Sequence, residues 1–263
     1  NPSELANLKR LTYSVWSTGT APWLSADKWA ACYDPDCGSL LYRDGWQYTP
    51  GKKDLSGETC WLGVDLSKSR DFTAAVLVFP SDGAGEFWQL PLFWLPSETA
   101  TKKSNLARYH EWSDQGFTRL VPGDVIDYDA LVGDLVGLRT TFNPLELMYD
   151  PWQAEPIRQR LESEGFDCVK VQQTISHLAS PTRDYERLIL EKKLHHSGNA
   201  VLTWQAGHVE VKSDNNQNVR PVKRAHGDYR TIDGIVAGVM ALSGALTYEP
   251  VPNYYDENEL EAA

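Results

Sequence analysis

The chain has 263 residues, 41% of them hydrophobic and 23% charged, which is the composition of a globular domain rather than of a disordered or fibrous chain. Its longest apolar runs, residues 74–80 and 235–242, are too short to cross a bilayer, and no signal-like segment opens the sequence. We therefore expect a cytosolic protein without a membrane partner. The formal net charge of −11 argues at first against a nucleic-acid ligand.

This negative charge is unevenly distributed along the chain. Residues 249–263 carry five acidic and no basic residues, which predicts a solvated acidic tail. Residues 183–230 reverse the balance, with nine basic residues against six acidic ones. Because affinity for a polyanion depends on the face that touches it, the whole-chain charge does not exclude DNA.

Residues 1–58 are rich in tryptophan and tyrosine and end in a connector that contains Pro, Gly and Lys. Ser25 is an expected N-cap for a short helix over residues 26–33. The many aromatic residues indicate packing against something, either the main domain or a neighbour outside this chain. Cys32 and Cys37 lack a second Cys or His pair nearby, and structural zinc takes four ligands, so we expect free thiols.

From residue 59 onward the pattern predicts one α/β domain. Three consecutive strands are expected at residues 60–67, 72–80 and 86–96. The expected elements that follow are a helix at 128–141 capped by Asp127, a strand at 145–149, a helix at 155–164 ended by Gly165, a strand at 167–172, and helices at 182–193 and 231–246. The polar residues 213–221 predict a hairpin tip. This order predicts a mixed sheet with helices on both faces.

Three aspartates lie beside strongly apolar sequence. Asp65 lies inside the apolar run 61–66, where an unpaired buried carboxylate costs several kcal/mol and must be paired, protonated or bound to metal. Asp150 ends the strand at 145–149, and Asp233 lies near the start of the apolar last helix. Taken singly, Asp150 is also an ordinary turn residue before proline, and Asp233 an ordinary first-turn acid. Asp65 is harder to explain in this way, because Asp is depleted in strands.

These residues lie in segments that resemble a known family. GVDLSKSRDFTAAVLVFP resembles the first two strands of the nuclease domain of tailed-phage terminase large subunits, and YDPWQAEPIRQRLESEG and RTIDGIVAGVMAL resemble its middle and its end. Residues 4–35 resemble the join between the packaging ATPase and the nuclease. The resemblance spans nearly the whole chain in the same order. It implies the RNase H-like fold, an α/β architecture whose mixed sheet has three antiparallel strands followed by parallel ones, with helices on both faces.

The resemblance also implies the chemistry. Asp65, Asp150 and Asp233 would be the catalytic residues that ligate two Mg²⁺ or Mn²⁺ ions for phosphodiester hydrolysis, with Asp71 as an auxiliary ligand. We assign Asp65 as the ligand that bridges the ions. The candidates for DNA binding are three basic residues, Arg220, Lys223 and Arg224. Lys223 and Arg224 are equally well explained as ordinary surface charge.

The implied protein is an endonuclease that cuts concatemeric viral DNA during genome packaging in the host cell cytoplasm. Residues 1–58 would be the join to an ATPase domain, 59–248 the nuclease and 249–263 the tail. No phosphate-binding G-x-x-x-x-G-K-[ST] loop is present, so the ATPase is expected outside this chain. The expected partners are double-stranded DNA, the portal, the small terminase subunit and the ATPase domain. The alternatives are a resolvase- or transposase-type nuclease of the same fold and a catalytically silent portal-docking module.

Overall fold

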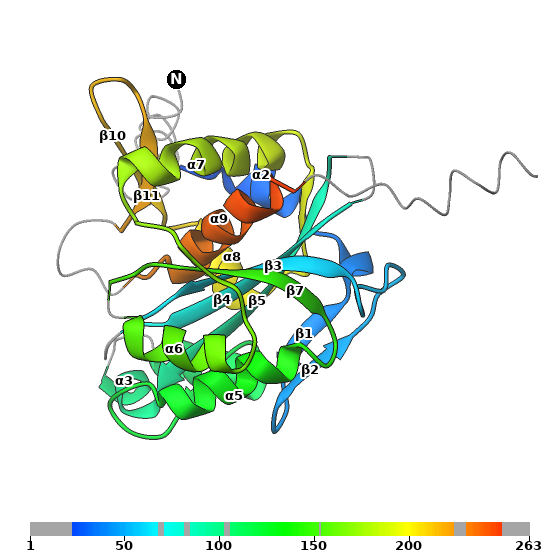
Figure 1. Cartoon of the computed structure of the whole chain (residues 1–263), viewed down its shortest axis with the longest axis vertical. Helices are drawn as coiled ribbons and strands as arrows, with labels where there is room; N and C mark the ends of the chain where they lie inside the picture. The colour runs from blue at the N-terminus through cyan, green and yellow to red at the C-terminus, as the bar shows by residue number, and fades with distance from the viewer. Residues whose placement is uncertain are drawn as a thin grey trace, which may run out of the picture.

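The protein is described here by a computed structural model that covers residues 23–67, 71–81, 85–102, 106–152, 154–223 and 230–248. Its centre is a seven-stranded sheet with the strand order β6-β5-β4-β3-β7-β8, in which β9 also pairs with β5 (Figure 1). The strands are β3 (Thr59–Asp65), β4 (Thr73–Pro80), β5 (Phe87–Pro96), β6 (Arg119–Val121), β7 (Asn143–Tyr149), β8 (Cys168–Lys170) and β9 (Leu194–His196).

The directions of these strands confirm the predicted mixed sheet. β3, β4 and β5 pair antiparallel, β7 pairs parallel with β3, and β8 pairs parallel with β7. The short strands β6 and β9, which were not predicted, also run parallel to β5. Both are only three residues long and lie outside the apolar runs that indicated the other strands, so their pairing partners define them.

Helices cover both faces of the sheet, as predicted (Figure 1). One face carries α2 (Ala26–Ala30), α7 (Ile175–Leu190), α8 (Ala200–Ala206) and α9 (Asp233–Ala245); the other carries α5 (Tyr128–Leu138) and α6 (Glu155–Ser163). The remaining helices are α3 (Ser97–Lys102) and α4 (Leu106–Asp114). Side chains alternate along β3, so that Trp61 joins the hydrophobic core under α9 while Leu62 and Val64 join the core under α5. None of the helices in the described part of the chain is long and apolar enough to span a membrane.

Residues 23–58 pack onto this domain rather than projecting from it. They form α2, a 3₁₀ turn η1 (Pro35–Cys37) and a hairpin of β1 (Ser39–Tyr42) and β2 (Trp46–Thr49). Trp29 is buried in the core under α9, and Leu40 in the core under α5. The aromatic segment was expected to pack either against the main domain or against a neighbour outside this chain. Its described residues pack against the main domain. Its cysteines, Cys32 and Cys37, are buried free thiols.

Several predicted boundaries differ from the structure. α2 ends at Ala30 rather than at residue 33, and the Ser25 side chain makes no capping hydrogen bond. α7 begins at Ile175, ahead of the predicted residue 182, with Pro181 inside the helix. Proline removes a backbone donor from the helix, but buried apolar side chains such as Leu178 stabilise the turns that precede it. The predicted hairpin tip is confirmed between β10 (Glu210–Ser213) and β11 (Val219–Val222).

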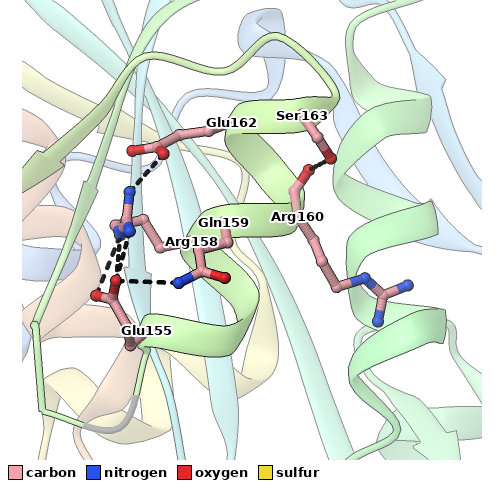
Figure 2. Close-up of polar contacts among 6 residues, drawn as sticks. All are labelled: Glu155, Arg158, Gln159, Arg160, Glu162 and Ser163. Carbon is pink, nitrogen blue, oxygen red and sulfur yellow. Dashed lines mark hydrogen bonds and ion pairs between the residues drawn. The ribbon is translucent and has the colours of Figure 1, made fainter.

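Helix α6 follows the loop that contains Asp150, and its side chains are tied to one another and to α5. Arg158 donates hydrogen bonds to Glu155 and to Glu162 on the same face of the helix (Figure 2). The Arg160 guanidinium points away from this group and pairs with Asp129 in the first turn of α5. These contacts are partly exposed and each is weak, but together they fix the helix that follows the loop.

His196, the last residue of β9, joins α2 to the sheet and is buried, with 3% of its surface exposed. Its ring stacks on Trp29 with centroids 4.4 Å apart. Nε2 lies 3.0 Å from the carbonyl of Trp29, and Nδ1 accepts the N–H of Gly198 at 3.1 Å. Only the neutral ring with its proton on Nε2 satisfies both contacts.

We therefore expect His196 to make the protein less stable as the pH falls. Burial lowers the pKa of His196, so below the unfolded-state value of about 6.5 the unfolded chain binds a proton that the folded protein refuses. Urea unfolding between about pH 7.5 and 5.5 should show a smaller loss of stability in His196→Gln than in the parent protein. His177→Gln, at an exposed position, is the control. Equal pH dependence in parent and His196→Gln would contradict the prediction.

Candidate active site

The end of β3 and the end of β7 bring two of the predicted aspartates side by side. Asp65 is the last residue of β3. In the parallel pair of β3 and β7, Val64 is opposite Tyr149, so Asp150, the next residue, lies beside Asp65 at the same edge of the sheet. Carboxyl ends of parallel strands share an edge, which is why residues far apart in the chain meet here.

Helix α9 brings the third aspartate to this edge because Gly63 allows the helix to approach closely. A Cβ on Gly63 would lie 2.0 Å from the carbonyl oxygen of Ala237, so the helix backbone rests directly on the strand. Further along the helix, a Cβ on Gly244 would lie 2.4 Å from the Trp61 ring. α9 therefore runs antiparallel to β3. Its first residue, Asp233, consequently lies over the end of the strand, next to Asp65.

The side chains at this edge surround a cavity of about 290 Å³. Its lining residues are Asp65, Leu66, Ser67, Asp71, Asp150, Trp152, Gln173, Lys223 and Asp233. A larger hollow of about 650 Å³ lies over α2 and α8, but its lining contains no acidic residue. Hydrolytic chemistry needs titratable or ligating groups, so the smaller cavity is the candidate active site.

The aspartates of the cavity differ in their hydrogen-bond partners. Asp65 Oδ1 accepts a hydrogen bond from Gln173 Nε2 at 2.9 Å, and Asp150 Oδ1 accepts the backbone N–H of Trp152 at 3.1 Å. Asp233 is buried, with 6% of its surface exposed, and its Oδ2 has no hydrogen-bond partner among the described residues. A buried carboxylate oxygen without a donor is costly and is expected to have a ligand.

Lys223, just after β11, supplies positive charge to the cavity. Its Nζ lies 2.5 Å from Asp71 Oδ2 and 3.9 Å from Asp233 Oδ1. Burial lowers the pKa of Lys223, but Asp233 and Asp71 outweigh that effect, so the pKa lies above its ordinary value. The lysine is therefore charged, and one cation balances part of the charge of four carboxylates.

Burial, together with the neighbouring carboxylates in the case of Asp65 and Asp233, raises the pKa values of the aspartates. Burial, and then the neighbouring Asp233, raise the pKa of Asp65 well above its ordinary value. Burial also raises the pKa of Asp150, and it raises that of Asp233 to about 6 in spite of Lys223. The folded protein thus holds these carboxylates where their ionised forms are unfavourable, which is typical of functional sites.

The cavity is lined by carboxylate oxygens, which are the ligands that hard divalent cations prefer. One of them, Oδ2 of Asp233, has no hydrogen-bond partner among the described residues and is available to a cation. In the described part of the chain, however, no three His, Cys, Asp or Glu side chains form a ready metal-binding group. Gln173 holds Asp65, and Lys223 holds Asp71, so the carboxylates share one cavity without converging on one point. Small side-chain rotations would be required for them to ligate an ion together.

The structure brings together five of the seven candidates from the sequence: Asp65, Asp71, Asp150, Asp233 and Lys223 line the cavity. Arg220, on β11, is not among the lining residues, and its Nη1 donates to the carbonyl of Pro221 at 3.4 Å. Arg224 lies outside the described residues. Four lining residues were not predicted: Leu66, Ser67, Trp152 and Gln173. All four follow strands that end at this edge of the sheet (β3, β7 or β8), as Asp150 does, so a position at or just after the end of a predicted strand is the signal that could have found them.

Comparisons of the sequence with known proteins agree with this geometry. Residues 1–249 match the family model described as "Terminase large subunit, endonuclease domain". The terminase large subunit of Enterobacteria phage HK97 is 28% identical over 211 residues, which are 78% of this chain and 41% of that protein. Protein YmfN of Escherichia coli strain K12 is 24% identical over 271 residues, 98% of this chain and 56% of that protein. The chain thus spans about half the length of these relatives.

Solved structures show the same fold. The HK97 large terminase has a TM-score of 0.70 at 24% identity, covering 85% of this chain and 43% of that one. The large terminase nuclease of thermophilic phage G20c has a TM-score of 0.55 at 11% identity, covering 86% of this chain and all of that one. The G20c nuclease with bound magnesium has a TM-score of 0.53 at 11% identity, covering 86% of this chain and 99% of that one. The RNase H-like mixed sheet expected from the sequence is confirmed.

Proposed function

Because this chain belongs to the family of terminase large-subunit endonuclease domains, we propose that it is a metal-dependent endonuclease that cuts concatemeric viral DNA during genome packaging. The observation that carries this proposal is the meeting of Asp65, Asp150 and Asp233 in one cavity, although they come from three separate elements. An acidic cluster of this kind has little structural use, because its charges destabilise the fold.

In this proposal Asp65, Asp150 and Asp233 hold two Mg²⁺ or Mn²⁺ ions, with Asp71 as an auxiliary ligand. When bound, such ions activate a water molecule and stabilise the leaving oxygen of the phosphodiester. Asp65 lies between Asp150 on the adjacent strand and Asp233 on the overlying helix, which supports its assignment as the bridging ligand. Gln173 orients the Asp65 carboxylate through its hydrogen bond. Magnesium is bound in the G20c nuclease, a structural neighbour.

Lys223 is the basic residue best placed to meet the scissile phosphate. Its ammonium group already lies in the cavity, paired with Asp71 and near Asp233. Entry of divalent ions would draw these carboxylates away, leaving Lys223 to bind a phosphate oxygen. We retain Arg220 and Arg224 as candidates for backbone contacts further along the DNA.

Lys223→Ala is therefore expected to weaken DNA binding and to slow cutting about tenfold or more. Because one phosphate contact is lost, the slope of log affinity against log salt concentration should become shallower by about one. Lys28→Ala, an exposed lysine on α2 far along the chain from the cavity elements, is the control and should change neither. An unchanged salt slope in Lys223→Ala would show that this lysine contacts no phosphate.

The proposed function is tested by incubating the purified chain with plasmid DNA and Mg²⁺ or Mn²⁺. We expect nicking or linearisation that stops when EDTA removes the metal. Binding of DNA without cutting in either metal would instead favour the catalytically silent docking module. A strong preference for branched DNA over linear duplex would favour the resolvase-type nuclease.

In the whole protein we propose that residues 1–58 join an ATPase domain to the nuclease at 59–248, with 249–263 as a tail. The described part of this joining segment packs into the cores on both faces of the sheet. A movement of the ATPase domain would therefore act directly on the nuclease domain. Double-stranded DNA, the portal and the small terminase subunit are the proposed partners, met in the host cell cytoplasm.

A further inference from the structure

Trp152 is the most exposed large hydrophobic residue in the described part of the chain, with 76% of its surface accessible. The loop that contains it connects β7 to α6 (Figure 1). The side chain of Trp152 lines the same cavity as Asp65 and Asp233. Scattered exposed hydrophobic residues are common, but a tryptophan this exposed is unusual in a folded domain. At the rim of a candidate active site, it indicates a contact with the ligand.

The position of Trp152 is set by the site itself. Its backbone N–H donates to Asp150 Oδ1 at 3.1 Å, and the intervening Pro151 restricts the turn. On the other side of the loop, Glu155 begins α6 and is bonded to Arg158 (Figure 2). The backbone of Trp152 is therefore held next to a proposed metal ligand, and its side chain lies at the edge of the cavity.

The size of the cavity determines which part of a DNA substrate would reach the indole. Its volume of about 290 Å³ is at the small end for ligand pockets. This space can hold a phosphate with its ions, but the base of the same nucleotide must remain outside, at the rim. An aromatic side chain at such a rim binds a base by stacking, with little dependence on base identity.

We propose that Trp152 stacks on a nucleobase next to the scissile phosphate and so favours DNA that is locally unpaired at the cut. In an intact duplex both faces of a base are covered by its neighbours, so stacking on an indole requires a base that has left the stack. This inference rests on the proposed nuclease function. It adds to that function a residue, Trp152, that distinguishes locally unpaired DNA from intact duplex.

The test measures DNA binding by the parent chain and its variants with Ca²⁺ in place of Mg²⁺, so that the carboxylates can hold a divalent ion while bound DNA is not cut. A labelled single-stranded oligonucleotide and its duplex are titrated with protein by fluorescence anisotropy at several salt concentrations. We expect Trp152→Ala to bind the single strand about tenfold more weakly, with a smaller effect on the duplex. Trp152→Phe keeps an aromatic ring and should retain most of the affinity. The salt slope should be unchanged, because no phosphate contact is lost.

The control is Tyr33→Ala, which removes an exposed aromatic side chain at the hollow over α2. It should bind both DNA forms like the parent protein. The proposal is overturned if Trp152→Ala binds single strands normally, if Trp152→Phe is equally weak, or if Trp152→Ala instead alters the oligomeric state. If the parent protein cuts DNA while Trp152→Ala binds normally, only this inference fails. If the parent neither binds nor cuts DNA, the proposed function fails with it.

Discussion

Asp65→Asn is expected to abolish DNA cutting while making the folded protein more stable. The variant keeps an oxygen that accepts the hydrogen bond from Gln173 but loses the charge needed for cation binding. Loss of a residue that supports a metal ligand commonly costs 10- to 100-fold in activity, so loss of the bridging ligand itself should cost at least about 100-fold. Cutting rates with Mg²⁺ and with Mn²⁺ provide the measurement.

The gain in stability follows from the raised pKa of Asp65. Burial and Asp233 make the ionised carboxylate less favourable in the folded protein than in the unfolded chain, so at neutral pH the charge destabilises the fold. Removing it should raise the melting temperature in metal-free buffer by a few degrees, about 2–4 °C per kcal/mol for a domain of this size. Addition of Mg²⁺ should then stabilise the parent protein more than the variant.

Asp27→Asn, at an exposed position on α2, is the matched control and should alter neither cutting nor melting temperature. If Asp65→Asn cut DNA at a rate near that of the parent, the Asp65 carboxylate would not be required for catalysis. A lower melting temperature would show that the Asp65 carboxylate stabilises the fold, through its hydrogen bond from Gln173 and the nearby charge of Lys223.

Gly63→Ala is expected to be the most destabilising small substitution in the sheet. Its Cβ would lie 2.0 Å from the backbone carbonyl of Ala237, so no side-chain rotation relieves the overlap and α9 must move away from β3. Overpacking typically costs about 1–3 kcal/mol, and a clash against backbone should reach or exceed about 3 kcal/mol. The same movement would shift Asp233 away from Asp65, so cutting should fall as well.

The comparison that isolates this effect is Gly133→Ala. Gly133 is exposed on α5, and a Cβ there would meet nothing within 4 Å. Alanine in an open helical position is more favourable than glycine by roughly 0.5–1 kcal/mol, so this variant should be slightly more stable than the parent. Urea unfolding of both variants measures the contrast. If Gly63→Ala were as stable as Gly133→Ala, helix α9 would not rest on the strand as described.

The long elements of the fold could be predicted because their patterns are local. The apolar runs that became β3, β4 and β5 and the capped start of α5 at Asp127 are properties of consecutive residues. The short strands β6 and β9 and the first turns of α7, which begins at Ile175, were not predicted. In each missed case, contacts with distant residues stabilise the element.

For the candidate site, the sequence alone showed that Asp65 needed a partner, because an acid within an apolar run cannot remain ionised and unpaired. It could not show what the partner would be. The neighbours of Asp65 depend on the parallel register of β7, on the close approach of α9 at Gly63, and on the end of β11, which brings in Lys223. The local sequence pattern indicates whether a side chain is buried. The distance between side chains from different segments is set only by how the sheet and the helices pack together. For that reason the sequence could single out the aspartates and name Lys223 as a candidate, while the arrangement of Gln173, Lys223 and Trp152 around the aspartates came from the tertiary structure.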